Sequence, residues 1–395
     1  VEDLVLSTPW IEATGDAALD GTTATFDIEA EASDLTPLGA ALDRPISGAA
    51  RLYASGTAQT DGSGADVTLG AVTTDLVTGI AQADPLLAGR VTLSGHATRT
   101  GPQSFSVEDL KLDGPAVAAT GRAEVIDGQA SFDLDLDARD LGAVGEAVDR
   151  PLAGEARLSA NGTAALDAST FDVTLDGRAT NLATGTAQAD ALFGGELTLS
   201  GHARRIGPED LLVENLAIAS EGLNVSGSAT IADGLGDFDL DIDIDDLAPI
   251  GTLAGRPLSG AVDLTATGTA SADLSRFDVT LDGTASDVTT GITQLDPLLA
   301  GETVLDAQAI RTGPQDFALP RFTLVNPQIR AMGEATVTDG LPTGDFDIEL
   351  AQIAPFAPGL SGPATVSAQA SGDASGGIDF EVTGRAQGTD IAATG

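Results

Sequence analysis

The sequence contains no cysteine and only one methionine, one tryptophan, one tyrosine and two histidines among its 395 residues. Without cysteine, disulfides and thiolate metal sites are excluded. Cations are also scarce, because 18 lysines and arginines stand against 60 acidic residues and give a formal net charge of −42. Nucleic-acid binding needs clustered cations and aromatic stacking platforms. The composition therefore argues against a nucleic-acid partner.

Long apolar runs and catalytic motifs are missing as well. No run approaches the ~20 apolar residues of a membrane-spanning helix, and the opening residues Val1-Glu2-Asp3 form no leader segment. No nucleophile–base–acid set, phosphate-binding loop or dinucleotide motif is found. We therefore expect no enzymatic activity and no cofactor.

The charge coexists with a hydrophobic fraction of 42% and a mean hydropathy of +0.12, which is too apolar for a disordered polyelectrolyte. The residues from Phe132 to Ala138 show how charged and apolar residues can share one folded chain, since the two kinds alternate there without error. In a β-strand such alternation places apolar side chains on one face and carboxylates on the other. The same pattern returns at 26–30 and 238–244. The chain is therefore expected to fold into two-faced strands.

These strands belong to a repeat of 106 residues. Phe26, Phe132 and Phe238 share one repeat position, and Arg-Pro pairs recur in step at Arg44 and Arg150. We place the copies at 1–14 (partial), 15–120, 121–226, 227–332 and 333–395 (partial), as one continuous β-repeat array over 1–395. Because both ends of the sequence fall inside a copy, we expect a fragment of a longer protein.

Each copy is predicted to hold six strands joined into an antiparallel meander. In the copy 121–226 and just before it, these strands are expected at 117–127, 129–139, 153–166, 169–182, 195–206 and 209–219. The phase of alternation slips within the sixth strand, between Val107 and Leu110 in one copy and Val213 and Leu216 in the next, which predicts a β-bulge. Short helical crossings are expected at 141–151 and 183–191.

The apolar face of a single sheet must be buried against another element of structure. The sequence contains no amphipathic helix of useful length to bury it. We therefore expect an all-β, elongated antiparallel sheet that curls lengthwise into a groove with an apolar inner face and an acidic outer face. Small inward residues favour a lined groove over a filled core, although a flat, closely apposed sandwich would also use them. The residues predicted to line the groove are Phe26, Ile28, Phe132, Leu134, Leu136, Phe171, Val173, Leu175, Leu199, Phe238, Leu240, Ile242, Ile244, Phe277, Val279 and Leu281.

The histidines, one acidic ladder and the repeated arginines are interpreted as structural residues. His96 and His202 share a repeat position but lie a full copy apart, so we expect surface residues and no metal site. The acidic ladder from Asp239 to Asp245 lacks the spacing of calcium-binding loops and reads as a solvated face. The arginines of the Arg-Pro crossings are expected to pair with local aspartates or cap the crossing, with contact to lipid headgroups as the alternative.

Three features of the sequence resemble the repeat region of TamB. They are the Arg-Pro crossings, the segment Asp84-Pro85-Leu86-Leu87-Ala88-Gly89 with its counterparts, and the acidic-apolar strands around them. TamB is the inner-membrane component of the translocation and assembly module, within the AsmA-like group. The resemblance implies a β-taco in the periplasm of a Gram-negative bacterium that conducts phospholipid between the inner and outer membranes and supports outer-membrane assembly.

The resemblance also implies partners. The acyl chains of phospholipids would lie in the groove, an outer-membrane barrel of the TamA type would bind a C-terminal region missing here, and an inner-membrane anchor would lie outside this fragment. The alternative, drawn from the repeats alone, is an extracellular adhesin or structural stalk with a dry, packed interior. The two hypotheses differ in whether the apolar face stays continuous and accessible from copy to copy.

Overall fold

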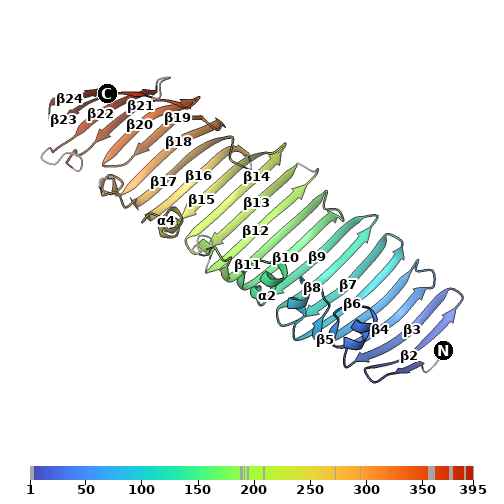
Figure 1. The fold of residues 1–395 in the computed structure, drawn as a ribbon. Coiled ribbons are helices and arrows are strands. Elements are labelled where there is room, and N and C mark those ends of the chain that lie inside the picture. The colour runs from blue at the N-terminus through green and yellow to red at the C-terminus, as the bar shows by residue number, and fades with distance from the viewer. Residues whose placement is uncertain are drawn as a thin grey trace. The chain divides into compact units, whose positions relative to one another are not determined.

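The chain folds into strands almost throughout. The computed structural model describes residues 4–186, 190, 192–193, 195–207, 210–271, 273–293, 295–354, 361–372, 377–386 and 388–394, with the backbone alone at 252–254 and 391. The predicted all-β class is confirmed: 24 strands form one antiparallel sheet that is not closed (Figure 1). The chain divides into two compact units, residues 1–208 and residues 209–395, and this division falls inside the predicted copy 121–226.

Among the elements of unit 1 with described bounds are twelve strands and three short helices. Its strands β1–β12 span Leu4–Ser7, Ile11–Asp20, Thr23–Ala32, Ser47–Gln59, Ala65–Val77, Arg90–Gly101, Ser104–Asp113, Val117–Ile126, Gln129–Ala138, Ala153–Ala165, Phe171–Ala183 and Glu196–Arg205. Its helices are α1 (Thr36–Ala41), the 3₁₀ helix η1 (Asp84–Leu87) and α2 (Leu141–Val148).

Unit 2 repeats this plan with twelve further strands. Strands β13–β24 span Leu211–Ser220, Leu223–Ala232, Leu235–Ile244, Ser259–Ser271, Phe277–Thr289, Glu302–Gly313, Asp316–Val325, Ile329–Thr338, Leu341–Leu350, Ala364–Gly372, Ile378–Ala386 and Thr389–Thr394. Its described helices are α4 (Ala248–Ala254) and the 3₁₀ helix η2 (Asp296–Leu298).

The six strands predicted for the second copy correspond to β8–β13, and each observed end lies within two residues of the predicted one. Local turn chemistry sets these boundaries. Asp127 and Gly128 both adopt positive φ (49° and 84°), as do Asp233 and Gly234 (51° and 75°). This conformation suits two-residue hairpins, because its twist matches that of the flanking strands. The Asp-Gly pairs therefore define one edge of each unit, which we term the hairpin margin and which carries the turns after the even-numbered strands.

The predicted β-bulge is confirmed at every copy. The register of β7 against β8 shifts between Val107 and Leu110, and the equivalent shift in β13 falls between Val213 and Leu216. The same shift occurs in β19 between residues 319 and 322. Asp109 adopts a φ of 51° at the first of these bulges. The extra residue reverses the alternation, so the apolar side chains before and after it point to one face.

The helical crossings lie at the opposite edge, the crossing margin, where α1, η1 and α2 join odd- to even-numbered strands in unit 1. The predicted helical turns at 141–151 are confirmed as α2, whereas 187–189 and 191 of the predicted crossing 183–191 lie outside the described residues. Each main crossing begins at a buried side chain: Leu35, Leu141, Leu247 and Ile353 expose 9%, 7%, 9% and 8% of their surface. These anchors stand 106 residues apart, and sequence reasoning missed them.

The repeated crossing arginines cap the helices through their backbone. The N–H of Arg150 donates to the carbonyl of Gly145 at the end of α2 (2.8 Å), and the N–H of Arg44 donates to the carbonyl of Gly39 (2.9 Å). Arg256 makes the same contact in unit 2. The expected ion pairs with local aspartates do not form among the described residues, and the three side chains are exposed to solvent at the margin. Only the capping part of the prediction therefore holds.

The long hairpins at the hairpin margin close on a second repeated aspartate. Oδ1 of Asp167 accepts the backbone N–H of Ser169 (2.9 Å), and Oδ1 of Asp273 accepts that of Ser275 (3.0 Å). Asp61 does the same for Ser63 one copy earlier. This arrangement is an Asx turn. The hydroxyl of Ser275, then its N–H and then the hydroxyl of Ser271 stabilise the charged carboxylate and lower the pKa of Asp273 to about 2.

This turn gives a pH prediction. A carboxyl whose folded pKa is depressed contributes stability that is fully present above its unfolded value of about 3.9 and is lost as pH falls through about 2. We expect the Asp273 carboxyl carbon to titrate near pH 2 by NMR, and Ser275→Ala to move that midpoint towards 3.9. A wild-type titration midpoint near pH 3.9 would mean that the hydrogen bonds of the turn do not stabilise the charged Asp273 carboxylate.

Candidate hydrophobic binding surface

The paired registers of unit 1 place apolar residues next to one another from strand to strand. Residues directly opposite in a sheet share a face, so each chain of partners forms a row at right angles to the strands. One row crosses all twelve strands without a polar residue: Leu6, Ala13, Ala30, Leu52, Ala71, Leu93, Leu112, Ala119, Leu136, Leu158, Gly177 and Leu199. Apolar surface is therefore continuous from copy to copy in this unit.

A second row runs beside the first on the same face of unit 1. It consists of Ala17, Phe26, Gly56, Val67, Ala97, Val107, Ala123, Phe132, Gly162, Val173 and Ala203. A third row lies between these two and contains Ile28, Leu134 and Leu175. It is interrupted only at the bulge of β7.

Unit 2 repeats the arrangement over its own twelve strands. One uninterrupted row contains Leu216, Gly227, Leu240, Ala266, Leu281, Ala307, Phe322, Gly333, Phe346, Ala368, Val382 and Ala393. A neighbouring row contains Ile218, Val225, Ile242, Leu264, Gly283, Leu305, Leu324, Ala331, Ile348, Val366 and Gly384. The rings of Phe322 and Phe346 meet edge to face across Gly333, with centroids 6.4 Å apart.

The sixteen predicted lining residues divide between the middle and the edges of this face. Thirteen lie in the rows above or in the stretch of Val213, Ala229, Phe238, Gly268, Val279 and Ala309. The other three stand in rows that contain polar residues: Phe171 and Phe277 near the hairpin margin, where they pair with Arg205 and Arg311, and Ile244 near the crossing margin. Phe171, Phe277 and Ile244 thus stand at the polar borders of the face, and the lining of a groove by the sixteen residues stays a prediction.

The two faces differ in how much solvent reaches side chains of similar size. In β10, Ala160 and Gly162 of the apolar rows are half-buried, whereas Ser159 and Thr163 on either side of this pair are exposed. The apolar rows remain partly accessible nonetheless, since Leu136 and Leu199 each expose 37% of their surface. Among the described residues no large side chain is fully buried. The apolar face is therefore shielded but not packed shut.

Glycines bring the strands together at fixed points of this face. Gly162 adopts a φ of 153° and lies opposite both Phe132 and Val173. A Cβ added at Gly162 would lie 2.1 Å from the carbonyl oxygen of Asp172. Gly56 and Gly268 have the same φ and the same close approach one copy away on either side. Only glycine fits there without displacing backbone, and the neighbouring phenylalanine covers the gap.

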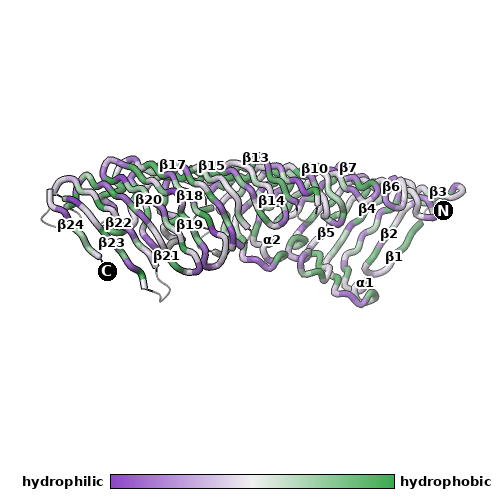
Figure 2. The backbone as a smooth tube through the Cα atoms, turned by 90° about the horizontal axis from the view of Figure 1, so that it is seen from above, coloured by the Kyte–Doolittle hydropathy of each residue, from purple (hydrophilic) through white to green (hydrophobic). Residues whose placement is uncertain are grey.

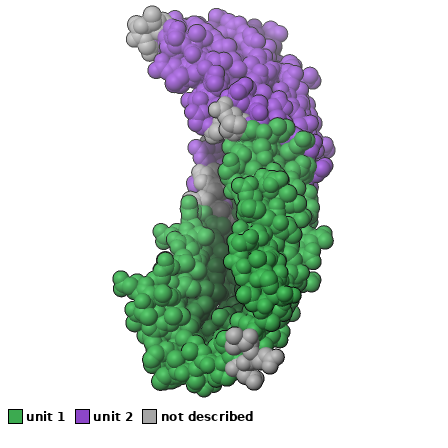
Figure 3. All heavy atoms as spheres, turned by 90° about the vertical axis from the view of Figure 1, so that its right-hand side faces the viewer, with its two compact units in different colours: residues 1–208 green, residues 209–395 purple. Residues whose placement is uncertain are grey.

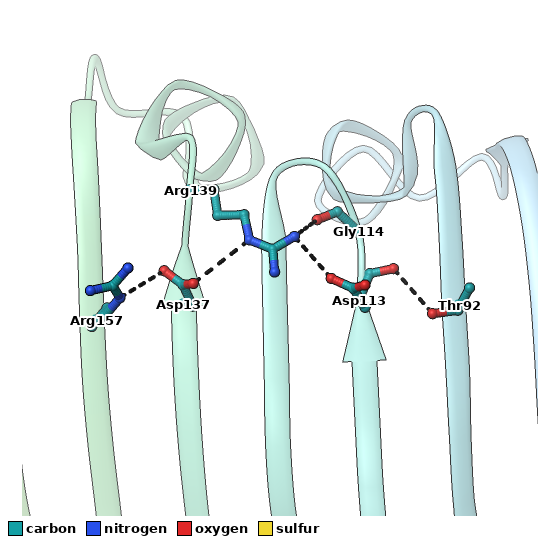
Figure 4. Close-up of polar contacts among 6 residues, drawn as sticks. All are labelled: Thr92, Asp113, Gly114, Asp137, Arg139 and Arg157. Atoms are coloured by element: carbon teal, nitrogen blue, oxygen red, sulfur yellow. Dashed lines mark hydrogen bonds and ion pairs between the residues drawn. The ribbon is translucent and has the colours of Figure 1, made fainter.

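The opposite face carries the charges (Figure 4). Arg139 lies between two aspartates of neighbouring strands: its Nη1 is 2.9 Å from Oδ1 of Asp113, and its Nε is 3.6 Å from Oδ2 of Asp137. Arg157 approaches the other oxygen of Asp137 (3.4 Å). The acidic strands also receive hydroxyl donors, as when Thr265 donates to Asp241 (3.1 Å). Figure 2 shows the resulting alternation of hydrophobic and hydrophilic residues along the strands.

The two histidines belong to this polar face. Nε2 of His202 is 2.7 Å from Oδ1 of Asp172, and Nε2 of His96 is 3.3 Å from Oδ1 of Asp66. Gln308 takes the third repeat position and donates to Asp278 (2.7 Å). A glutamine can replace the histidine as a cross-strand donor but not as a metal ligand of this kind. Within the described ranges, no group of three or more acidic or histidine side chains could hold a metal ion.

Both units contain a hollow. Figure 3 shows unit 1 hollowed lengthwise between two walls. Unit 2 has a pocket of about 910 Å³ whose lining includes Glu334, Asp345, Gln369 and Glu381. These four residues are partners across successive strands, so the pocket lies on the polar face. Its carboxylates suit a polar ligand or water and not a hydrocarbon chain.

Comparison with protein-family models, with curated proteins and with solved structures found no match to this chain. In the part of the chain that the structure describes, no helix combines the length and the apolar character needed to cross a membrane.

Proposed function

We propose that this chain is a segment of a lipid conduit, in which the acyl chains of phospholipids lie against the apolar rows. The observation that carries this proposal is the continuity of those rows over all twelve strands of each unit. Twelve strands at ~4.8 Å extend an apolar path over about 55 Å in one unit. No bond is made or broken in such a function, and no cofactor is needed.

The energetics favour hydrocarbon as the ligand. Each CH₂ group that leaves water gains about 0.8 kcal/mol, so an acyl chain of ~16 carbons gains on the order of 12 kcal/mol. A lipid crossing open water loses all of this. On an uninterrupted apolar surface the loss is replaced by small barriers between similar positions, because the uninterrupted rows offer only glycine, alanine, valine, leucine, isoleucine and phenylalanine to the acyl chain.

The partial exposure of the apolar face supports a conduit over the dry stalk. A stalk would stabilise itself by packing its interior to the density of a protein core. Here Leu136 is 37% exposed, and the residues around it are half-buried at most. In the conduit that we propose, the apolar rows line the hollow of unit 1 that is visible in Figure 3.

The resemblance to the TamB repeat region supports a cellular setting for the conduit. We place it in the periplasm of a Gram-negative bacterium, as part of a longer AsmA-like protein that is anchored in the inner membrane. Its C-terminal region would contact an outer-membrane barrel of the TamA type and would support outer-membrane assembly. The acidic face, with a net charge of −42 for the chain, keeps such an exposed sheet soluble and resists edge-to-edge association.

Site-specific photo-crosslinking tests the proposal. A photoreactive residue at position 136 points to the apolar rows, and one at position 135 points to the polar face. We expect phospholipid adducts from position 136 and few from position 135 in cells that express the protein. Equal labelling at the two positions, or none at either, would contradict the conduit.

A further inference from the structure

The hairpin margin of the apolar face carries one arginine per copy. Arg99 follows Ala97 by two residues, Arg205 follows Ala203, and Arg311 follows Ala309 in unit 2. Residues two apart in a strand share a face, so these arginines continue the side of the apolar rows. Their cross-strand partners confirm the placement: Arg205 lies opposite Phe171, and Arg311 lies opposite Phe277.

These arginines are held at the border by backbone and aromatic groups. Nε of Arg99 donates to the carbonyl of Gly101 (3.1 Å), and Nε of Arg205 and of Arg311 make the equivalent bond to the glycine two residues on (3.1 and 3.3 Å). On its two sides Arg311 pairs with Phe277 and Phe317, whose rings meet edge to face at 6.5 Å. The guanidinium therefore has a fixed place at the edge of the apolar face.

Charge neutralisation does not account for Arg99 or Arg311 at this border. On the polar face Arg51, Arg122, Arg157 and Arg178 each approach a carboxylate within 4 Å. In the described part of the chain, the side chains of Arg99 and Arg311 donate only to backbone carbonyls. These contacts use two N–H groups of each guanidinium, which has five. Three donors remain for an oxyanion, in a planar arrangement that suits a phosphate.

The surroundings of these arginines match the boundary between a headgroup and its acyl chains. Phe105 and Phe317, the partners of Arg99 and Arg311 on the next strand, expose 48% and 40% of their surface. Leu166 and Leu274 in adjacent turns expose 65% and 59%. Arginine beside exposed aromatic and aliphatic side chains is the combination that proteins place at the interfacial region of membranes.

We infer that Arg99, Arg205 and Arg311 bind the phosphodiester of phospholipids whose acyl chains lie on the apolar rows. This inference rests on the proposed function and adds to it a polar track, with one phosphate site per copy along the hairpin margin. A lipid would then keep its headgroup at this margin while its hydrocarbon lies inside. Within unit 1, six strands at ~4.8 Å separate Arg99 from Arg205 by about 29 Å.

The experiment compares two ligands on the full chain. The combined variant Arg99→Gln/Arg205→Gln/Arg311→Gln and the matched variant Arg122→Gln/Arg157→Gln/Arg204→Gln lose the same charge from opposite faces. Each protein is incubated with vesicles containing phosphatidylethanolamine and, separately, with diacylglycerol of the same chains. It is then re-isolated, and its bound lipid is quantified by mass spectrometry. We expect the first variant to bind about tenfold less phosphatidylethanolamine, as loss of charge-assisted hydrogen bonds implies, with diacylglycerol unchanged.

The outcomes separate the two proposals. The margin arginines could instead serve only to hold the hairpins together. The first variant would then bind less of both lipids, or the same amount of both as wild type. Either result overturns the headgroup inference while the conduit stands. If the matched variant loses phosphatidylethanolamine equally, the effect belongs to net charge and the inference is also overturned. If the wild-type chain takes up neither ligand, the proposed function itself fails. Thermal unfolding followed by circular dichroism checks that each variant folds.

Discussion

Replacing Val173 with aspartate is expected to reduce lipid transfer along unit 1 about 100-fold. Val173 lies in the apolar row between Gly162 and Ala203. A charged side chain against hydrocarbon costs about 2.5–3.5 kcal/mol, and every 1.4 kcal/mol corresponds to about tenfold. One such group would place a barrier across the path, because the row offers no polar neighbour to shield it. The measurement is the rate at which a fluorescent phospholipid moves between donor and acceptor vesicles.

The neighbouring residue supplies the control. Thr174 has almost the same size and shape as Val173, belongs to the same strand and points to the polar face, where it lies opposite His202. Thr174→Asp adds the same charge and should leave transfer within about twofold of wild type, since a single surface substitution away from special features has little effect. Equal losses in the two variants would show that the apolar row is not the path.

Gly162→Ala is expected to destabilise unit 1 by roughly 2–4 kcal/mol, because a methyl group at this position meets the Asp172 carbonyl and a strained backbone together. Its Cβ would lie 2.1 Å from that oxygen and 2.8 Å from the Cα of Val173, at a φ of 153°. The strands must separate to admit it. With a urea m-value of about 3 kcal/mol/M, the unfolding midpoint should fall by about 1 M.

A second glycine on the same face separates steric conflict from a general effect of adding a methyl group. Gly177 lies between Leu158 and Leu199 in its row, but a Cβ there would meet its nearest neighbour at an ordinary 3.4 Å. Gly177→Ala should therefore be neutral or stabilise by up to about 1 kcal/mol through the unfolded chain. If the two variants unfold at the same urea concentration, the close approach at Gly162 does not exclude a larger side chain there.

Periodicity could predict the strands and their faces because side-chain direction has a fixed period of two. The alternation from Phe132 to Ala138 was enough to place Leu134 and Leu136 together. The bulge was also predictable, since the phase slip between Val107 and Leu110 leaves a trace in the sequence. The structure adds the reason for it: without the extra residue, Leu110 and Leu112 would point to the polar face and the rows would end at β7.

The borders of the face could not be predicted in the same way. Leu141 begins a crossing that has no strand or long-helix period, so nothing in the sequence marks it as one of the most buried residues. Arg205 stands beside Arg204, and the pair reads as an ordinary charged strand end. Only the pairing with Phe171 shows that one arginine belongs to the apolar side and the other to the polar side. Such assignments depend on register between strands, which composition does not specify.

Continuity of the apolar rows is the claim from which the conduit, the margin arginines and the effect of Val173→Asp all follow. Native mass spectrometry of the intact chain, purified without detergent from cells, tests it most directly. We expect copies of phospholipid to remain bound and to be displaced by added fatty acid. A chain that emerges free of lipid and takes up none from vesicles would contradict the account and leave only a structural spacer.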